Sequence, residues 1–255
     1  MTDEPPALWR DLRRFTPARV ALGRAGNGLP TAAHLAFQAD HAAARDAVHA
    51  ELDVATLQSA LAAAGLTARL VRSACPDRQT YLRRPDLGRS LADADAAALA
   101  ADPTPGKLAF VVCDGLSALA VQHHAAGLLA RIVPALEPTA VIVIARQGRV
   151  ALGDDIGAAL GASAVVVLIG ERPGLSSPDS LGAYLTWQPQ RGRSDAERNC
   201  VSNIRPAGLP MSAAAYKLGW LVREMRRRRL SGVALKDEAP RLASDQDRST
   251  SVLNT

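Results

Sequence analysis

The stretch AVVVLIGERPGLSSPDSLGAYL, Ala164 to Leu185, decides the fold of this chain. Its first part, Ala164 to Ile169, is apolar throughout and rich in valine. Such a short, uniformly apolar run predicts a strand buried on both faces, as in a parallel sheet. Gly170 ends the run, and a polar, turn-rich segment from Glu171 to Asp179 follows. Because open α/β sheets bind ligands beyond the carboxyl ends of their strands, we expect a ligand site at this segment.

Further strand patterns alternate with helical patterns along most of the chain. The alternation predicts an α/β fold with a mainly parallel, doubly wound, Rossmann-like sheet and helices on both faces. The other expected strands are Ala68–Val71, Lys107–Val112, Ala140–Ile144 and Gly182–Trp187, and the last strong helical pattern is Met211–Arg229.

The N-terminal part has a different character. The segment FTPARVALGRAGNGLPT, Phe15 to Thr31, is rich in glycine and proline and predicts a structured loop. Helical patterns begin at Thr31 and again at Val54, the second one ending before Gly65. We therefore expect a small helical N-terminal domain over residues 1–50 and the sheet domain over residues 51–235. The polar tail, residues 236–255, is expected to be disordered.

Two long polar segments interrupt the sheet domain. We interpret Cys75–Arg89 and Gln188–Leu209 as polar loops, and long loops of this kind in a compact domain are typically functional.

Composition excludes several classes of protein. The chain has 255 residues, 48% of them hydrophobic, which suffices for a core without disulfides. Three scattered cysteines indicate neither a disulfide framework nor a zinc site. The net charge of +5 is spread over the sequence and does not indicate nucleic-acid binding. No secretory signal and no run long enough for a membrane span is seen, so we expect a cytoplasmic protein.

Common catalytic and phosphate-binding signatures are missing. Neither GxGxxG nor GxxxxGK[ST] follows a strand, which disfavours a dinucleotide-binding enzyme. Asp114 follows a buried strand and could cap the next helix or point into the crevice. For Asp154 and Asp155 we favour helix capping over metal binding, because acidic residues suit a helix start. We expect no catalytic acid–base pair and no metal site.

The remaining polar groups allow more than one interpretation. Glu171 is either a solvated loop carboxylate or an acceptor for a ligand, while Ser176, Ser177 and Asp179 are expected to cap or shape the loop. For Cys200 we favour a packing role over a Cys/His dyad. Two basic groups of residues are interpreted as surface features: the helical stripe His41, Arg45 and His49, exposed or facing a subunit, and the helix end Arg226–Arg229.

Six blocks of the sequence, in this order, carry a resemblance to a known family. They are FTPARVALGRAGNGLPT (15–31), AFQADHAAARDAVH (36–49), VVCDGLSALAVQHHA (111–125), RQGRVALGDDIG (146–157), LIGERPGLSSPDSLGAYLTWQP (168–189) and GRSDAERNCVSNIRPAGL (192–209). Together they resemble the small (light) subunit of ethanolamine ammonia-lyase, over roughly Leu12 to Asp237. The blocks ERPGLSSPDSLG and ERNCVSNIRP are the most specific.

The resemblance implies a carbon–nitrogen lyase that depends on adenosylcobalamin (coenzyme B12) and converts ethanolamine to acetaldehyde and ammonia by a radical mechanism. It implies a hetero-oligomer in which a large (heavy) subunit holds substrate and reacting groups, with cobalamin at the subunit interface. The cobalamin contacts of the family's small subunit match Val150, Glu171 and Cys200. Ethanolamine catabolism of this type also raises the alternative of a bacterial microcompartment as the location.

Two other hypotheses are kept beside the lyase subunit. A free-standing nucleotide-binding α/β protein would bind a nucleotide without a partner, and a basic nucleic-acid-binding module would bind with strong salt dependence.

Overall fold

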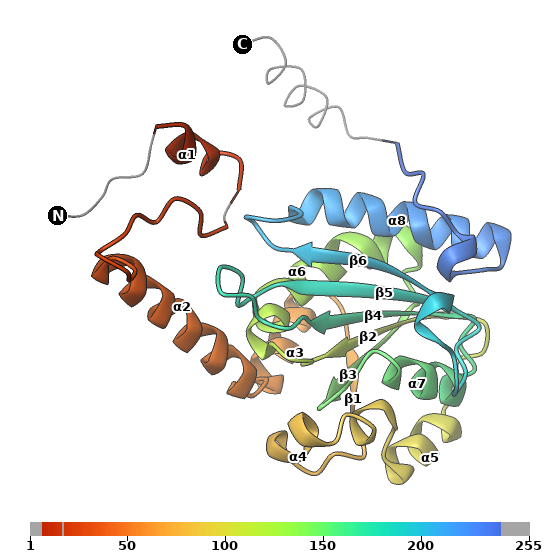
Figure 1. The fold of residues 1–255 in the computed structure, drawn as a ribbon. Coiled ribbons are helices and arrows are strands. Elements are labelled where there is room, and N and C mark those ends of the chain that lie inside the picture. The colour runs from red at the N-terminus through yellow and green to blue at the C-terminus, as the bar shows by residue number, and fades with distance from the viewer. Residues whose placement is uncertain (1–6, 17, 241–255) are drawn as a thin grey trace.

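A six-stranded sheet forms the centre of the protein, and a computed structural model describes residues 7–16 and 18–240 of it (Figure 1). The strand order is β1-β3-β2-β4-β5-β6. The strands are β1 Ala68–Arg72, β2 Leu108–Cys113, β3 Val141–Arg146, β4 Ala164–Gly170, β5 Leu181–Trp187 and β6 Arg198–Ile204.

The first four strands are parallel, and the last two make the sheet mixed. β1, β3, β2 and β4 pair in parallel, whereas β4–β5 and β5–β6 are antiparallel. The connection from β4 to β5 is the loop Glu171–Ser180, which contains no crossover helix, so β5 must return antiparallel. The prediction of a mainly parallel α/β sheet is confirmed, with two antiparallel strands at one edge.

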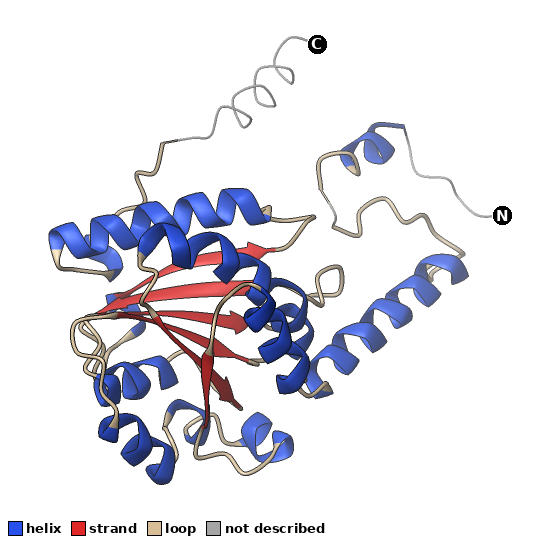
Figure 2. Ribbon diagram, turned by 180° about the vertical axis from the view of Figure 1, so that it is seen from behind, coloured by secondary structure: helices blue, strands red, loops and turns tan. Residues whose placement is uncertain are grey.

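Helices cover both faces of the sheet, as predicted (Figure 2). One face packs against α3, α6 and α8, and the other against α5 and α7. The helices are α1 Ala7–Leu12, α2 Thr31–His49, α3 Val54–Ala63, α4 Arg78–Arg83, α5 Asp93–Ala101, α6 Ala118–Leu136, α7 Leu152–Leu160 and α8 Met211–Arg228, with short 3-10 turns at Leu87–Arg89, Asp195–Glu197 and Gly232–Ala234.

The apolar strands are buried on both sides. Every residue of β2 and of β4 is buried. Phe110 and Val166 point into the layer of α6 and α8, whereas their neighbours Val111 and Val165 point into the layer of α7. Because each buried aliphatic side chain contributes roughly 1.5–3 kcal/mol, these two strands anchor both halves of the core.

The N-terminal helices lie at one side of the sheet. Figure 1 shows α2 projecting on the side toward which β4 points, with α1 beyond it. The segment between α1 and α2 contains no helix or strand in its described part, apart from isolated bridge residues at Arg24, Ala25 and Gly28, as expected for a structured loop. No helix among residues 7–16 and 18–240 is long and apolar enough to span a membrane.

Two sequence-based expectations about polar loops are wrong. Cys75–Arg89 contains α4, whose first turn is capped by the side chain of Asp77. Gln188–Leu209 contains the strand β6. Only Arg198, Val201 and Ile204 of β6 are buried, because β6 is an edge strand and its pairing with β5 has a register shift. Of the tail predicted to be disordered, residues 241–255 lie outside the described part.

Candidate functional site

A cavity of about 430 Å³ opens at the carboxyl ends of β2, β3 and β4. Its walls include Tyr81 from α4, Arg149 and Val150 after β3, Glu171 after β4, and Tyr184 on β5. The cavity lies where the sequence predicts a ligand site, beyond the strand ends of an open sheet. It contains two of the three predicted site residues, Val150 and Glu171.

Glu171 is held in place at the start of the β4–β5 loop. Its Oε2 accepts hydrogen bonds from the Ser180 hydroxyl (2.5 Å) and from the backbone N–H of Asn203 on β6 (3.2 Å). Its carboxylate passes over Gly182, where a Cβ atom would lie 2.8 Å from Oε1. The carboxylate is thus a positioned acceptor at the cavity wall, a geometry that favours the interpretation of Glu171 as an acceptor for a ligand.

Val150 follows β3 in a turn that is organised by Asp114. The buried carboxylate of Asp114 accepts from the backbone N–H groups of Gln147 (2.9 Å), Gly148 (3.1 Å) and Gly115 (3.0 Å). Burial raises the pKa of Asp114 above its ordinary value, although these three hydrogen bonds oppose the shift. Asp114 therefore does not cap α6, whose N-cap is Ser117. It shapes the turn that presents Arg149 and Val150 to the cavity.

Replacing Asp114 with asparagine is expected to lower the free energy of unfolding by about 1–3 kcal/mol. The substitution turns one carboxylate oxygen, which accepts from a backbone N–H, into an NH2 group, and this group would face backbone N–H donors in a buried position. Urea unfolding monitored by circular dichroism measures this loss. Asp77→Asn is the matched control: Asp77 also accepts a backbone N–H, but on the exposed surface, and the smaller cost of a helix cap is expected there. Equal losses in both variants would contradict the assigned role of Asp114.

Two glycines let the strand ends approach each other closely. Gly115 has a φ of +58°, and a Cβ there would lie 2.2 Å from the carbonyl oxygen of Gly170. A Cβ on Gly170 would lie 1.9 Å from the carbonyl oxygen of Ser117. The turn after β2 and the end of β4 can therefore pack against each other only with glycine at both positions.

The α4 segment contributes two residues that the sequence did not single out. Buried Arg78 donates to the carbonyl oxygens of Gly115 (2.7 Å) and of Val48 at the end of α2 (2.8 Å), so it links the N-terminal helix to the site. Tyr81 is fully buried and lies under the guanidinium of Arg149, 4.3 Å from the ring centroid. The length and polarity of Cys75–Arg89 predicted a functional segment, but not these contacts.

Cys200 lies on β6 directly opposite Tyr184. Desolvation raises the pKa of the Cys200 thiol above its ordinary value, even though the residue as a whole is exposed. Burial likewise raises the pKa of Tyr184. Both groups therefore stay neutral at pH 7, and Cys200 offers a packing contact rather than a thiolate. Cys200, the third predicted site residue, lines neither cavity, but Tyr184, its neighbour across the strands, lines both.

A second cavity, of about 530 Å³, adjoins the first. The two share Arg149, Val150 and Tyr184, and the second continues past Arg191 and Arg193 in the β5–β6 connection. The Nε of Arg149 is buried and has no hydrogen-bond partner among the described residues. The combined space thus presents the carboxylate of Glu171 in the first cavity, three aspartates (Asp154, Asp155 and Asp195) in the second, several guanidinium groups and apolar walls.

Asp154 and Asp155 were predicted to cap α7, and this prediction is wrong, although both lie in the first turn of the helix. Asp154 forms a buried two-pronged ion pair with Arg198 of β6 (2.7 and 2.6 Å). Asp155 pairs with Arg191 and accepts from the backbone N–H of Leu91. The N-cap of α7 is Ala151, which makes no side-chain cap hydrogen bond. These pairs tie the β5–β6 connection to α7 and so frame the second cavity.

Ser176, Ser177 and Asp179 precede a strand, so they cap no helix. The backbone groups of Ser177 and Gly174 bond to each other and form a turn, consistent with a loop-shaping role. Asp179 instead approaches His123 and His124 of α6.

Lowering the pH is expected to loosen the β5–β6 connection through Glu197. The backbone N–H of Ser194, with Arg193 and the Ser194 hydroxyl, lowers the pKa of Glu197 to about 2, from 4.5 ordinarily. A depressed folded-state pKa contributes stability above pH 4.5, and this contribution is lost as the pH falls from about 4.5 to 2. Unfolding midpoints of the wild type and Glu197→Gln measured across this range are expected to converge at the acidic end. A gap between them that is independent of pH would contradict this prediction.

Comparison with known proteins identifies the family of this chain. Residues 6–236 match the family model described as ethanolamine ammonia-lyase light chain. The chain is 57% identical over 250 residues to an ethanolamine ammonia-lyase small subunit of Azotobacter vinelandii, covering 94% of this chain and 93% of that protein. It is 55% identical over 248 residues to the protein of the same name from Xanthomonas campestris pv. campestris strain B100, covering 94% and 91%. It is also 57% identical over 235 residues to the one from Bradyrhizobium diazoefficiens, covering 90% of each chain. The chain therefore belongs to the ethanolamine ammonia-lyase light-chain family.

Proposed function

We propose that this chain is the small subunit of an adenosylcobalamin-dependent ethanolamine ammonia-lyase, a carbon–nitrogen lyase that converts ethanolamine to acetaldehyde and ammonia. The observation that carries the proposal is 57% identity, over 94% of the chain, to a protein of that name. In this assignment the chain helps to bind the cobalamin, and a large subunit carries the substrate and the reacting groups.

The residues at the site suit a binding role. A corrinoid is a flat, largely apolar ring fringed by amide groups, and those amides need hydrogen-bond partners when they are buried. The positioned carboxylate of Glu171 can accept from an amide N–H or a ribose hydroxyl, and the charge makes such a bond stronger. Val150 offers an apolar side chain and backbone groups, and Cys200 offers a small polarizable contact. Adenosylcobalamin itself supplies a carbon–cobalt bond whose homolysis starts radical chemistry.

In this proposal the chain orients the bound cobalamin and excludes water from it. Asp114 holds the turn of Val150, and Ser180 together with Asn203 holds Glu171, so the contacts are fixed before a ligand arrives. Such preorganisation lowers the entropy cost of binding. No catalytic residue is assigned to this chain. The other titratable groups that line the cavity with Glu171 are tyrosines and arginines, and burial raises the pKa of both tyrosines, Tyr81 and Tyr184, as desolvation raises that of the Cys200 thiol.

The proposed function also assigns a role to each of the two expected domains. Residues 51–235 form the Rossmann-like, cobalamin-contacting domain, and residues 1–50 form a helical N-terminal domain. Most of the exposed large apolar side chains among the described residues belong to the N-terminal part: Trp9, Leu12, Phe15, Leu29, Leu35 and Phe37. An apolar surface of this kind suits contact with the large subunit. The stripe of His41, Arg45 and His49 lies on the same helix and is a subunit-facing surface in this proposal.

Reconstitution tests the function. The chain is co-expressed with a large subunit of the family, and acetaldehyde is measured with and without adenosylcobalamin. We expect cobalamin-dependent activity from the pair and none from either chain alone. An inactive pair in which both chains are folded would overturn the proposal.

Size-exclusion chromatography separates this function from a free-standing nucleotide-binding protein, since only the lyase subunit is expected to co-elute with the large subunit. We place the complex in the cytoplasm, with a bacterial microcompartment as the alternative location. The proposal includes neither nucleic acid nor membrane as a partner.

A further inference from the structure

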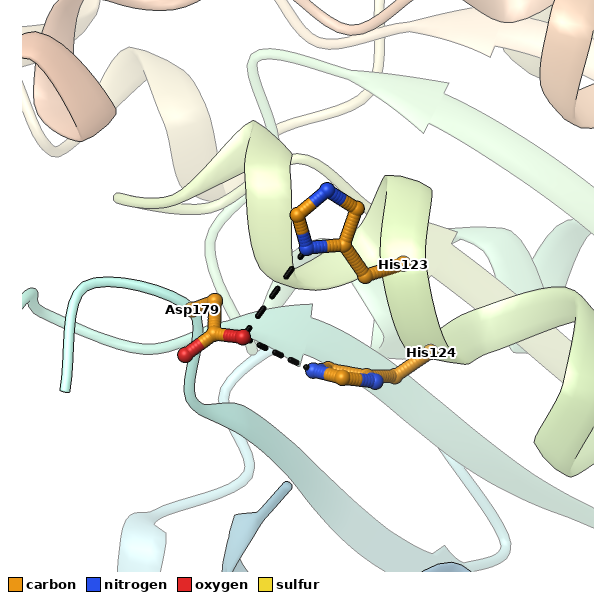
Figure 3. A group of neighbouring side chains, drawn as sticks. All are labelled: His123, His124 and Asp179. Atoms are coloured by element: carbon orange, nitrogen blue, oxygen red, sulfur yellow. Dashed lines mark hydrogen bonds and ion pairs between the residues drawn. The ribbon is translucent and has the colours of Figure 1, made fainter. Parts of the chain in front are cut away.

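Three side chains with metal-binding atoms converge outside the two cavities. His123 and His124 lie on α6, and Asp179 faces them from the β4–β5 loop (Figure 3). The Asp179 Oδ2 is 3.2 Å from His124 Nε2 and 3.8 Å from His123 Nδ1. One potential ligand atom of each residue lies within 4.8 Å of the others.

These separations suit one small cation. Zinc binds imidazole nitrogen and carboxylate oxygen at about 2.0–2.2 Å in tetrahedral sites, which places neighbouring ligand atoms about 3.3–3.6 Å apart. The two distances to Asp179 lie on either side of this range, so small side-chain adjustments would place Asp179 at ligand spacing from both imidazoles. The two imidazole nitrogens lie within 4.8 Å of each other, and a rotation of the exposed His123 side chain would bring them to the same spacing. Two imidazoles and one carboxylate favour a transition metal ion over magnesium or calcium, which prefer oxygen ligands.

An ion could reach this cluster from solvent, and one of its four coordination positions would remain open. The side chain of His124 is 9% exposed, that of Asp179 is 30% exposed and that of His123 is 54% exposed. The buried imidazole is therefore held by packing, and the exposed one faces solvent. Three protein ligands with solvent on one side give the arrangement in which water takes the fourth place.

Asp179 lies between two residues that bond to other parts of the protein, so an ion bound at Asp179 would affect the whole β4–β5 loop. The carbonyl oxygen of the preceding residue, Pro178, accepts from the Ser117 hydroxyl at the start of α6 (2.7 Å). The hydroxyl of the following residue, Ser180, donates to Glu171 (2.5 Å). An ion shared by Asp179 and α6 would therefore secure the loop next to the residue that positions Glu171.

We propose that His123, His124 and Asp179 bind one divalent transition metal ion of the zinc class, which fastens the β4–β5 loop to α6. Binding of the ion does not depend on the proposed lyase function, so the two can fail separately.

Cobalt(II) is the probe, because four-coordinate cobalt has an intense visible absorption that zinc abolishes when it displaces the cobalt. The untagged full chain, freed of metal with a chelator, is titrated with cobalt(II) and then with zinc. We expect one cobalt ion per chain with the four-coordinate spectrum. His123→Ala and Asp179→Asn are each expected to weaken binding by more than about tenfold. His123 is exposed, so its replacement leaves the fold intact.

His49→Ala is the matched control, because His49 is also an exposed helical histidine but lies on α2, outside the cluster. It is expected to bind cobalt as the wild type does. Absence of the four-coordinate spectrum, or equal affinity in the wild type, His123→Ala and Asp179→Asn, would overturn the site. Hydrogen exchange of residues 171–180 that is unchanged by zinc would overturn the fastening of the loop.

Discussion

Replacing Arg198 with methionine is expected to lower the free energy of unfolding by about 3–5 kcal/mol, because it leaves the carboxylate of Asp154 buried without its partner. Both side chains of this pair are only 2% exposed. The guanidinium also donates to the Thr186 hydroxyl (3.0 Å) and to the carbonyl oxygen of Arg193 (2.9 Å), so these acceptors lose a donor as well. Urea unfolding followed by circular dichroism measures the loss.

Arg191→Met is the matched control for this prediction. Arg191 makes a similar two-pronged pair with the neighbouring carboxylate, Asp155, but its own side chain is 74% exposed. The Asp155 side chain is 7% exposed, but it keeps the hydrogen bond from the Leu91 N–H, and its arginine partner lies in solvent, so a clearly smaller loss than in Arg198→Met is expected. The double variant Asp154→Leu with Arg198→Met should recover much of the lost stability, because it removes the orphaned charge. A loss in Arg198→Met no larger than that in Arg191→Met would show that the buried pair does not hold β6 to α7.

The central strands were predictable because their apolar pattern is complete. β2 and β4 are buried on both faces, so every residue carries the signal, and the turn chemistry after β4 marks where the strand ends. The placement of Glu171 at a strand end followed from the same pattern. The family blocks then added Val150 and Cys200, which no pattern of apolar residues would have indicated.

The edge strand β6 was missed for the opposite reason. Its exposed positions are Cys200, Ser202 and Asn203, its partly buried Asn199 bonds through its side chain to Gly232 and Leu235, and its first buried position is an arginine, so the segment has no apolar alternation. That arginine is tolerated inside only because Asp154, distant in the sequence, meets it there. Neither residue reveals the pairing on its own, and the same holds for Asp114 and the turn after β3.

Replacing Glu171 with alanine is expected to weaken cobalamin binding by the reconstituted two-subunit enzyme about 10- to 100-fold. A hydrogen bond to a charged group contributes about 1.5–3 kcal/mol, and each 1.4 kcal/mol is about tenfold in affinity. Glu171→Gln keeps an acceptor oxygen but loses the charge, so an intermediate loss is expected. Because the reacting groups belong to the large subunit in this proposal, kcat at saturating cobalamin should change less than the cobalamin concentration needed for half-maximal activity.

Glu224→Gln provides the control for this last experiment. Glu224 is another hydrogen-bonded glutamate, but its partners are Arg227 and Arg228, and it lies on α8 and lines neither cavity. Its replacement should leave the cobalamin affinity unchanged, so a loss in both variants would indicate a general effect of removing charge.

Ser180→Ala tests the positioning of Glu171 directly, because it removes the 2.5 Å hydrogen bond to Oε2 and leaves the carboxylate in place. A smaller loss than in Glu171→Ala is expected. Cobalamin affinity unchanged in Glu171→Ala, with the two subunits assembled, would remove Glu171 from the binding site.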